Sequence, residues 1–276
     1  RTRSRILWGH GRSSMARTGD LYTWGPIVVA PDSVYLLSDT RDMIGWPDSR
    51  FLGFFTDHKL KKVDASGGPP FTLADAPDAR GGTWNREGVI VFAPNLIGPL
   101  YRVSANGGTV TAATKMDAQR QENTHRYPHF LPDGNHFVFL VRRAAAGKGE
   151  EPAIMVGSLD SMERVPVVHT ASNVAYASGH LLFVRQGTLI AQPFDVDRIQ
   201  TDGEALPVVE KLLMDERFSL GVFSASQNGL LAYQTGVAST RGQLYWVDRS
   251  GKRLEPVGSP EEYYFGSCAR LSPDGK

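Results

Sequence analysis

His125 and His129 are the first candidates for chemistry, because they are four residues apart in the sequence. On a helix, this spacing places two metal ligands on one face. Pro128 lies between them and no glutamate follows His125, so we expect neither a helix nor a zinc-protease motif. We predict instead that His125 packs or hydrogen-bonds at the entrance of a repeat unit and that His129 flanks a buried strand. A metal site is the less favoured alternative.

Two glycine-containing strings resemble phosphate-binding loops only in part. Gly9-His10-Gly11 begins like a dinucleotide loop, but Ser14 occupies the position of the third glycine. The string AGKG at 146–149 lacks the first glycine of a nucleotide-binding loop and the hydroxyl residue after its lysine. We predict an irregular segment and a solvent-exposed loop, and no cofactor site.

Three aspartates, Asp48, Asp133 and Asp274, each follow a proline at the start of a turn. Their carboxylates could coordinate Ca²⁺ together with nearby carbonyl groups. Such an aspartate more often accepts hydrogen bonds from the amides of its own turn. We favour this turn role and predict no metal-binding residues.

No sequence motif in this chain indicates a catalytic nucleophile. The G-x-S-x-G string that marks the nucleophile of α/β-hydrolases does not occur. A Ser-His-Asp triad is spatial rather than sequential, so it stays a less favoured alternative. Tyr101, Tyr245 and Trp246 could mark a recognition surface, but we expect core packing. The sequence therefore predicts no catalytic residues and no enzymatic activity for this segment.

The composition narrows the function classes further. The chain has 276 residues, 41% of them hydrophobic, and a formal net charge of +1, which argues against a protein that coats nucleic acid. The single Cys268 excludes an intrachain disulfide and a cysteine-based metal cluster. Because no apolar run reaches about 18 residues, we expect no membrane-spanning segment.

One unit recurs along the chain: a turn of the Pro/Ser-Asp/Asn-Gly type followed at once by an apolar run. Successive turns are 39, 46, 45, 50 and 46 residues apart, at Ser49, Gly88, Gly134, Gly179, Gly229 and Gly275. A second strand-like unit lies between successive copies, and a short third run follows it. These second units occupy residues 59–68, 100–108, 153–161, 188–197 and 243–252.

Three or four short strands in a period of about 40–50 residues are typical of a β-propeller blade. A single four-stranded blade cannot bury both of its apolar faces, whereas neighbours stacked around an axis cover them. We therefore predict an all-β propeller of four-stranded antiparallel blades over residues 46–276. The run after each turn should be an inner strand, starting near Phe51, Val89, Phe137, Leu181 and Leu230. Residues 1–45 should form an irregular segment and residues 142–152 a surface loop.

Several strings resemble known propellers. LPDGN at 131–135 and SPDGK at 272–276 are similar to the PD40, or WD40-like, repeat of TolB-type propellers. The chain from about residue 46 onward resembles most the C-terminal propeller of bacterial receptor-type serine/threonine protein kinases. The strings that carry this resemblance are GGTWNREGVIVFAP at 81–94, GPLYRVSANGG at 98–108, RQENTHRYPHFLPDG at 120–134, VGSLDS at 156–161 and LLFVRQGTLIAQPFD at 181–195.

The resemblance implies a non-catalytic interaction or sensing domain on the extracytoplasmic side of a membrane. Its partner would be a protein or a peptide, and ATP-dependent activity would belong to a kinase domain elsewhere in the parent protein, since this chain has no kinase motif. A TolB-like periplasmic partner-binding protein is the alternative, and a propeller hydrolase or lyase is less favoured. The fold alone does not name the ligand.

The two ends of the chain lead to a further expectation. Lys276 lies within a turn signal, and residues 1–45 offer no convincing partner strand. Because propellers protect their sheet edges by closing the ring, we expect a truncated, incomplete ring of about five blades that aggregates when made alone.

Overall fold

A computed structural model describes residues 50–64, 68–143, 151–225, 231–233 and 235–236, together with the strands at 17–18, 21–22, 27–30, 33–36, 43–45, 241–247 and 253–262. These residues form strands, turns and bends, and none of them is helical. In this described part of the chain, no helix is therefore present that could cross a membrane. The all-β prediction is confirmed.

Four successive segments each form an antiparallel sheet, and apart from β21 in the fourth sheet the strands pair in chain order. The first sheet contains β5 (Met43–Gly45), β6 (Phe51–Thr56), β7 (Lys59–Asp64) and β8 (Phe71–Asp75). The second contains β9 (Gly82–Trp84), β10 (Val89–Phe92), β11 (Tyr101–Ser104) and β12 (Thr111–Ala112). The third contains β13 (Glu122–Phe130), β14 (His136–Arg143), β15 (Ala153–Ser158) and β16 (Arg164–His169). The fourth contains β17 (Val174–Ala177), β18 (His180–Arg185), β19 (Thr188–Asp195), β20 (Gln200–Thr201) and β21 (Leu206–Val209), and β20 and β21 both pair with β19.

The other strands form antiparallel pairs. These pairs are β1 (Arg17–Thr18) with β2 (Leu21–Tyr22), β3 (Ile27–Ala30) with β4 (Ser33–Leu36), β22 (Met214–Asp215) with β23 (Leu220–Gly221), β24 (Phe223–Ala225) with β25 (Leu231–Tyr233), and β26 (Arg241–Val247) with β27 (Arg253–Glu262).

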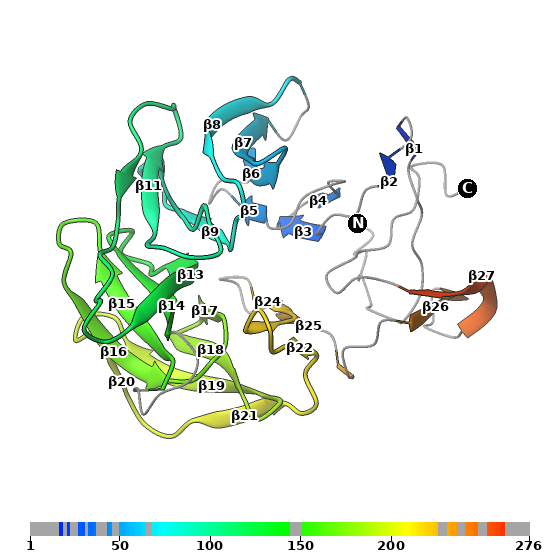
Figure 1. Cartoon of the computed structure of the whole chain (residues 1–276). Helices are drawn as coiled ribbons and strands as arrows, with labels where there is room; N and C mark the ends of the chain where they lie inside the picture. Colours follow the sequence, from blue (N-terminus) through cyan, green and yellow to red (C-terminus); the bar gives the residue numbers. More distant parts are fainter. Residues whose placement is uncertain are drawn as a thin grey trace, which may run out of the picture.

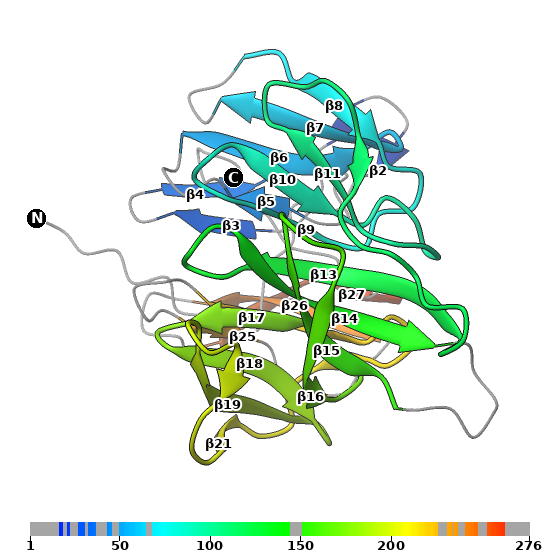
Figure 2. The same ribbon diagram turned by 90° about the vertical axis from the view of Figure 1, so that its left-hand side faces the viewer.

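The four sheets follow one another around a common centre. In Figure 1, the first strands β5, β9, β13 and β17 lie nearest to this centre, and β8, β16 and β21 lie farther out. First strands of successive sheets contact one another, β5 with β9, β9 with β13 and β13 with β17. In the side view of Figure 2, the first sheet and the fourth sheet lie at opposite ends of the molecule. The predicted repeat of four-stranded sheets around an axis is therefore observed.

The radial order differs from the prediction in one respect. The runs after the turns form strands where expected, as β6, β10, β14, β18 and β25, but each is the second strand of its sheet or pair. The innermost strands precede the turns, and three of them, β5, β9 and β17, are only three or four residues long. A strand of three or four residues gives little periodic pattern, whereas the second strands β6, β10, β14 and β18 are covered on both faces by neighbouring sheets and form clear apolar runs.

The turn before β14 shows why the repeat signal contains Asp and Gly. Gly134 has a φ of 72°, a left-handed conformation that favours glycine. One carboxylate oxygen of Asp133 accepts hydrogen bonds from the amides of Asn135 and His136, at 3.1 and 3.0 Å. Asp133 therefore has the turn role that we favoured.

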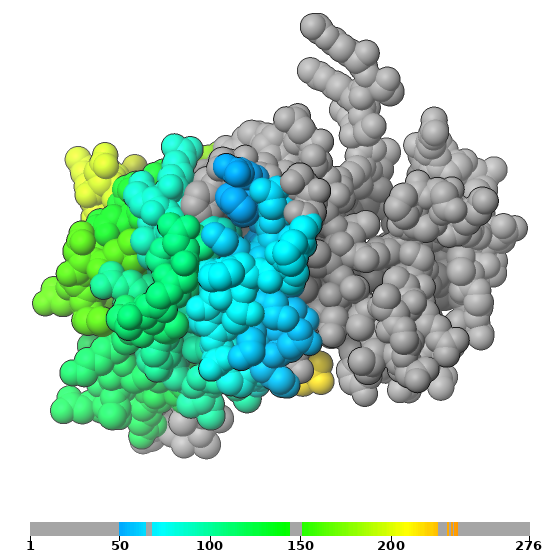
Figure 3. Space-filling view, turned by 90° about the horizontal axis from the view of Figure 1, so that it is seen from above, coloured from blue at the N-terminus to red at the C-terminus, as the bar shows by residue number. Residues whose placement is uncertain are grey.

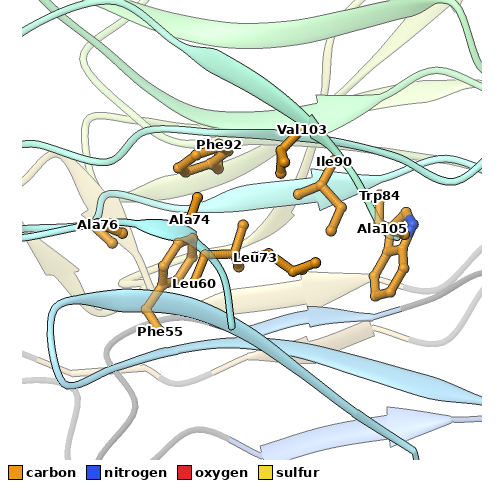
Figure 4. Close-up of a cluster of buried hydrophobic side chains, with 11 residues drawn as sticks. Phe55, Leu60, Leu73, Ala74, Ala76, Trp84, Ile90, Phe92, Val103 and Ala105 are labelled. Atoms are coloured by element: carbon orange, nitrogen blue, oxygen red, sulfur yellow. The ribbon is translucent and has the colours of Figure 1, made fainter. Parts of the chain in front are cut away.

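The hydrophobic core is divided into layers between successive sheets. Figure 4 shows the layer between the first and second sheets, where Phe55 and Leu60 face Ile90 and Phe92. Three further layers join the second sheet to the third, the third to the fourth, and the fourth to the segment around β22–β25. In the space-filling view of Figure 3, the coloured atoms of the first three sheets form one continuous surface. Each sheet is therefore stabilised mainly by its neighbours.

Part of the predicted organisation lies outside the described residues. Within residues 1–45, the structure describes only the strands β1 to β5. β5 belongs to the first sheet, although it precedes the predicted domain boundary at residue 46. Most of the predicted surface loop, residues 144–150, falls outside the description, as do residues 263–276. The expected gap in the ring depends on these segments and stays a prediction.

Candidate functional site

A cluster of arginine side chains lies at one edge of the sheets. At this edge, which we call the entry edge, the first strands begin and the second strands end. Four arginines gather here: Arg80 before β9, Arg126 within β13, Arg142 near the end of β14 and Arg217 in the turn between β22 and β23. We call these four residues the arginine cluster.

Arg126 is the most buried member of the arginine cluster, with only 4% of its surface exposed. Its Nε donates to Thr124 Oγ1 at 3.1 Å, and its Nη1 and Nη2 donate to the carbonyl oxygens of Phe218 and Leu96 at 3.3 and 3.0 Å. The hydroxyl of Tyr127 donates to the same Phe218 oxygen at 2.9 Å. Residues of the third sheet thus hold the β22–β23 turn against the entry edge.

An irregularity in β13 lies at Arg126 and Tyr127 and affects the direction of their side chains. The register with β14 shifts between Arg126 and His129, and Tyr127 has a φ of 51°, which is uncommon for a residue with a side chain. Gly81 has a φ of 88°, and a Cβ placed on it would lie 3.0 Å from the Cα of Tyr127. Only glycine leaves room for this close approach, which the hydrogen bond from Tyr127 N to Arg80 O at 2.9 Å completes.

Arg80 is also largely buried, and its hydrogen bonding is incomplete among the described residues. Its Nη1 donates to Ala79 O at 2.6 Å and lies 2.8 Å from a carboxylate oxygen of Asp78. Its Nε is buried without a hydrogen-bond partner in the described part of the molecule. The guanidinium lies 5.0 Å from the ring centroid of Phe218, and that of Arg217 lies 5.4 Å from the same ring. Phe218 therefore contacts two cations through its aromatic ring.

The other two arginines extend the cluster toward solvent. Arg142 is half-buried, and its Nη1 donates to the carbonyl oxygen of Arg217 at 2.9 Å. Arg217 is exposed, and its guanidinium pairs with the buried carboxylate of Asp215 through contacts of 2.7 and 3.1 Å. Hydrogen bonds from Arg217 lower the pKa of Asp215, so this carboxylate is ionised at neutral pH.

The charges of the arginine cluster are only partly compensated. Asp78 pairs with Arg80 and Asp215 with Arg217, whereas neither Arg126 nor Arg142 has a carboxylate within 4.0 Å among the described residues. Burial lowers the pKa of Arg126 to about 10, and the charges of Arg142 and Arg80 act in the same direction, whereas Tyr127 opposes them. Arg126 is still charged at neutral pH, so the arginine cluster has two guanidinium groups without a paired carboxylate among the described residues, and an anion would neutralise this charge.

A second polar cluster lies inside the third sheet. The side chain of Glu122 is fully buried, and both of its oxygens accept hydrogen bonds from Nη2 of Arg164, at 2.8 and 2.7 Å. One of them also accepts from Asp117 N at 2.8 Å and lies 3.3 Å from Nε2 of His125. Nδ1 of His125 lies 2.7 Å from Thr114 Oγ1. This network joins the segment before β13 to β16.

The protonation state of this network follows from its partners. Burial lowers the pKa of His125, and Glu122 opposes this effect. A neutral ring that donates from Nε2 to Glu122 and accepts at Nδ1 from Thr114 satisfies both contacts. Burial raises the pKa of Glu122, but hydrogen bonds from His125 and Asp117 and the charge of Arg164 outweigh it, so the pKa lies below its usual value. With all these groups satisfied and buried, we assign the network a structural role.

The structure places the histidine pair in a strand. His125 and His129 both lie in β13, so the helical spacing that suggested two metal ligands does not apply. Both ring nitrogens of His125 are occupied by Thr114 and Glu122, and its ring packs 5.1 Å from that of Phe139. His129 is opposite Val138 in the register, and burial lowers its pKa to about 4. His125 therefore packs and hydrogen-bonds as predicted from the sequence.

The remaining candidate residues are separated from the arginine cluster or lie outside the description. Tyr101 packs against the core layer between the first and second sheets. The side chains of the other candidates are outside the described residues: Gly9, His10, Gly11, Ser14, Asp48, Ala146, Gly147, Lys148, Gly149, Tyr245, Trp246 and Asp274. The sequence-based interpretation missed the arginine cluster, because its members come from four separate segments. The one local signal is the charged Arg126 at a buried position within β13.

The chain is similar to known proteins in its fold and not in its sequence. No protein-family model matches the chain, and no curated protein matches it. A protein assigned as TolB from Agrobacterium tumefaciens is 14% identical, with a TM-score of 0.57 over 83% of this chain and 87% of that chain. A gluconolactonase, XC5397 from Xanthomonas campestris, is 14% identical, with a TM-score of 0.55 over 96% of this chain and 91% of that chain.

A third solved structure has the same architecture. It is the calcium-binding protein regucalcin from Agrobacterium tumefaciens, 11% identical, with a TM-score of 0.52 over 79% of this chain and 73% of that chain. The fold is a β-propeller. The predicted fold class is therefore confirmed, and the similarity to TolB extends to the propeller fold. At these identities the similarity concerns the fold alone.

The comparisons correct one prediction. The prediction that this segment is not an enzyme is contradicted as an exclusion, because propellers with a similar fold include an enzyme, the gluconolactonase, so the fold does not rule out catalysis. The conclusion depended on the lack of linear catalytic motifs. In a propeller, the residues at one edge come from different blades, so a site assembled there leaves no such motif in the sequence.

Proposed function

We propose that this β-propeller binds a ligand with an anionic group, a carboxylate or a phosphate, at the arginine cluster. The observation that carries the proposal is the environment of Arg126, whose buried guanidinium donates only to neutral oxygen atoms in the described part of the chain. A buried charge without a counter-charge is unfavourable, and an anion nearby would compensate it.

The arrangement of the cluster supports entry of the anion from solvent. Arg217 is exposed, Arg142 is half-buried and Arg126 is buried, so the positive charge continues from the surface inward. The planar guanidinium matches the geometry of carboxylates and phosphates. The same cations could also stabilise negative charge that develops on a bound substrate, so the proposal covers ligand recognition and catalysis alike.

We expect inorganic phosphate and acetate to bind to the wild-type chain in a chloride-free buffer of low ionic strength. The variant Arg142→Gln should bind both probes at least about tenfold more weakly, the loss expected for one hydrogen bond to a charged group. Isothermal titration calorimetry would measure the dissociation constants. Arg126→Gln should show a similar loss, and circular dichroism would verify that each variant is folded.

The matched control is Arg198→Gln, an exposed arginine in the turn after β19, at the edge opposite the entry edge. It changes the net charge by the same amount and should leave both dissociation constants unchanged. Equal affinities for the wild type, Arg142→Gln and Arg198→Gln would contradict binding at the arginine cluster.

We also propose that the parent protein is a bacterial receptor-type serine/threonine kinase with this propeller on the extracytoplasmic side. The strings at 81–94, 98–108 and 120–134 support this proposal, and the last of them contains Arg126. Sequencing the gene upstream of this segment tests it. A kinase domain followed by a membrane-spanning segment is expected, whereas a signal peptide with no kinase domain would favour the TolB-like periplasmic alternative.

A further inference from the structure

Two residues with exposed apolar side chains belong to a loop that contacts the arginine cluster through its backbone. Leu96 and Ile97 lie in the loop between β10 and β11, and 39% and 65% of their surfaces are exposed. The carbonyl oxygen of Leu96 accepts the hydrogen bond from Nη2 of Arg126 at 3.0 Å, so these residues adjoin the buried guanidinium. Single exposed apolar residues are common on protein surfaces, but two adjacent ones beside a charged site can contact the apolar part of a ligand.

Backbone hydrogen bonds hold this loop in place. Gly98 N donates to Asn123 O, and His125 N donates to Gly98 O, both at 2.9 Å. Gly98 is the residue after Ile97, and His125 is the residue before Arg126, so these bonds attach the loop to β13 directly beside both residues. The backbone that carries Leu96 and Ile97 is therefore held next to the cation by the same strand that carries Arg126, and the exposure of the two side chains does not result from a loose end.

We propose that the ligand is an organic anion with an apolar substituent next to its charged group. The arginine cluster would hold the carboxylate or phosphate, and Leu96 and Ile97 would cover the apolar part. This inference rests on the proposed anion-binding function and specifies the ligand class. Two sources share this chemistry, a short fatty acid and the C-terminal residue of a peptide that ends in an apolar amino acid.

The test compares acetate, hexanoate and N-acetyl-L-leucine by calorimetry, with hexanamide as the uncharged counterpart of hexanoate. Of hexanoate and N-acetyl-L-leucine, the compound with the higher affinity should bind at least about tenfold more tightly than acetate. Each buried methylene group raises the affinity about fourfold. Hexanamide should bind more weakly than hexanoate. Tighter binding of hexanoate identifies a fatty acid, and tighter binding of N-acetyl-L-leucine identifies a peptide C-terminus.

Two serine variants locate the apolar contact. Ile97→Ser should remove most of the advantage over acetate and leave the affinity for acetate itself unchanged. Met162→Ser is the matched control, because Met162 is an equally large side chain, 51% exposed, in the turn between β15 and β16 at the opposite edge. It should have no effect on any of the probes.

The outcomes separate this inference from the function on which it rests. If phosphate and acetate bind and depend on Arg142, but hexanoate and N-acetyl-L-leucine bind no more tightly than acetate, the apolar contact is refuted and anion binding stands. An apolar advantage that is equal in Ile97→Ser and the wild type also overturns the inference. If no anion binds, both proposals fail.

Discussion

Replacing Phe139 by alanine should lower the free energy of unfolding by about 3–5 kcal/mol, the range for truncation of a fully buried phenylalanine. Phe139 has no exposed surface and lies in the core layer between the second and third sheets. Its ring packs 5.7 Å from that of Phe137 and 5.1 Å from that of His125. Urea denaturation followed by tryptophan fluorescence would measure the loss.

The surroundings of Phe139 leave little scope for the cavity to close. Gly157, on the neighbouring strand β15, is so close that an added Cβ would lie 3.0 Å from the Phe137 ring and 3.2 Å from the Phe139 ring. The control is Val165→Ala on β16, where half of the side chain is exposed and the loss should stay below about 1 kcal/mol. A loss below about 1 kcal/mol for Phe139→Ala as well would show that this layer is not tightly packed in solution.

Replacing Glu122 by glutamine should destabilise the fold by about 3–5 kcal/mol, because it removes one partner of a buried ion pair and leaves the other charge uncompensated. The side chain of Glu122 is fully buried and that of Arg164 is only 13% exposed. Glutamine keeps the shape of the side chain, so the loss reports the charge and the hydrogen bonds rather than a cavity. Denaturation at pH 7 would measure it.

The control is Glu163, the exposed residue next to Arg164 in the sequence. Glu163→Gln should change stability by less than about 0.5 kcal/mol, as is usual for surface substitutions. A double-mutant cycle with Arg164→Gln should show that the losses at Glu122 and Arg164 are not additive, because the two residues are in contact. Additive losses would mean that the ion pair contributes nothing of its own.

The effect of Glu122→Gln should also depend on pH. The pKa of Glu122 is lowered in the folded protein relative to its ordinary value of 4.5. A depressed carboxyl pKa contributes stability that is fully present above the unfolded pKa and is lost as the pH falls through the folded one. The difference between the wild type and Glu122→Gln should therefore be complete at pH 7 and shrink at pH values below 4.5. A difference that is independent of pH would contradict the ion-pair explanation.

The sequence by itself determined the second strand of each sheet and the period of the repeat. The Asp-Gly turn at 133–134 and the apolar run after it are local signals, because turn chemistry and hydrophobic runs involve neighbouring residues. β14 and β18 accordingly begin within one residue of the predicted positions, at His136 and His180. The period of the repeat then led to the propeller, since blades of this kind bury their faces only against one another.

Only the tertiary structure decided the radial order of the strands and the composition of the site. Arg126 and Phe218 are 92 positions apart, and Glu122 and Arg164 are 42 apart, so no sequence window contains either pair. The net charge of +1 gave no indication of the arginine cluster, because acidic residues elsewhere balance it. The inner strands and the side chains from several blades meet only when the sheets surround a common axis, and that packing depends on the whole chain rather than on any local pattern.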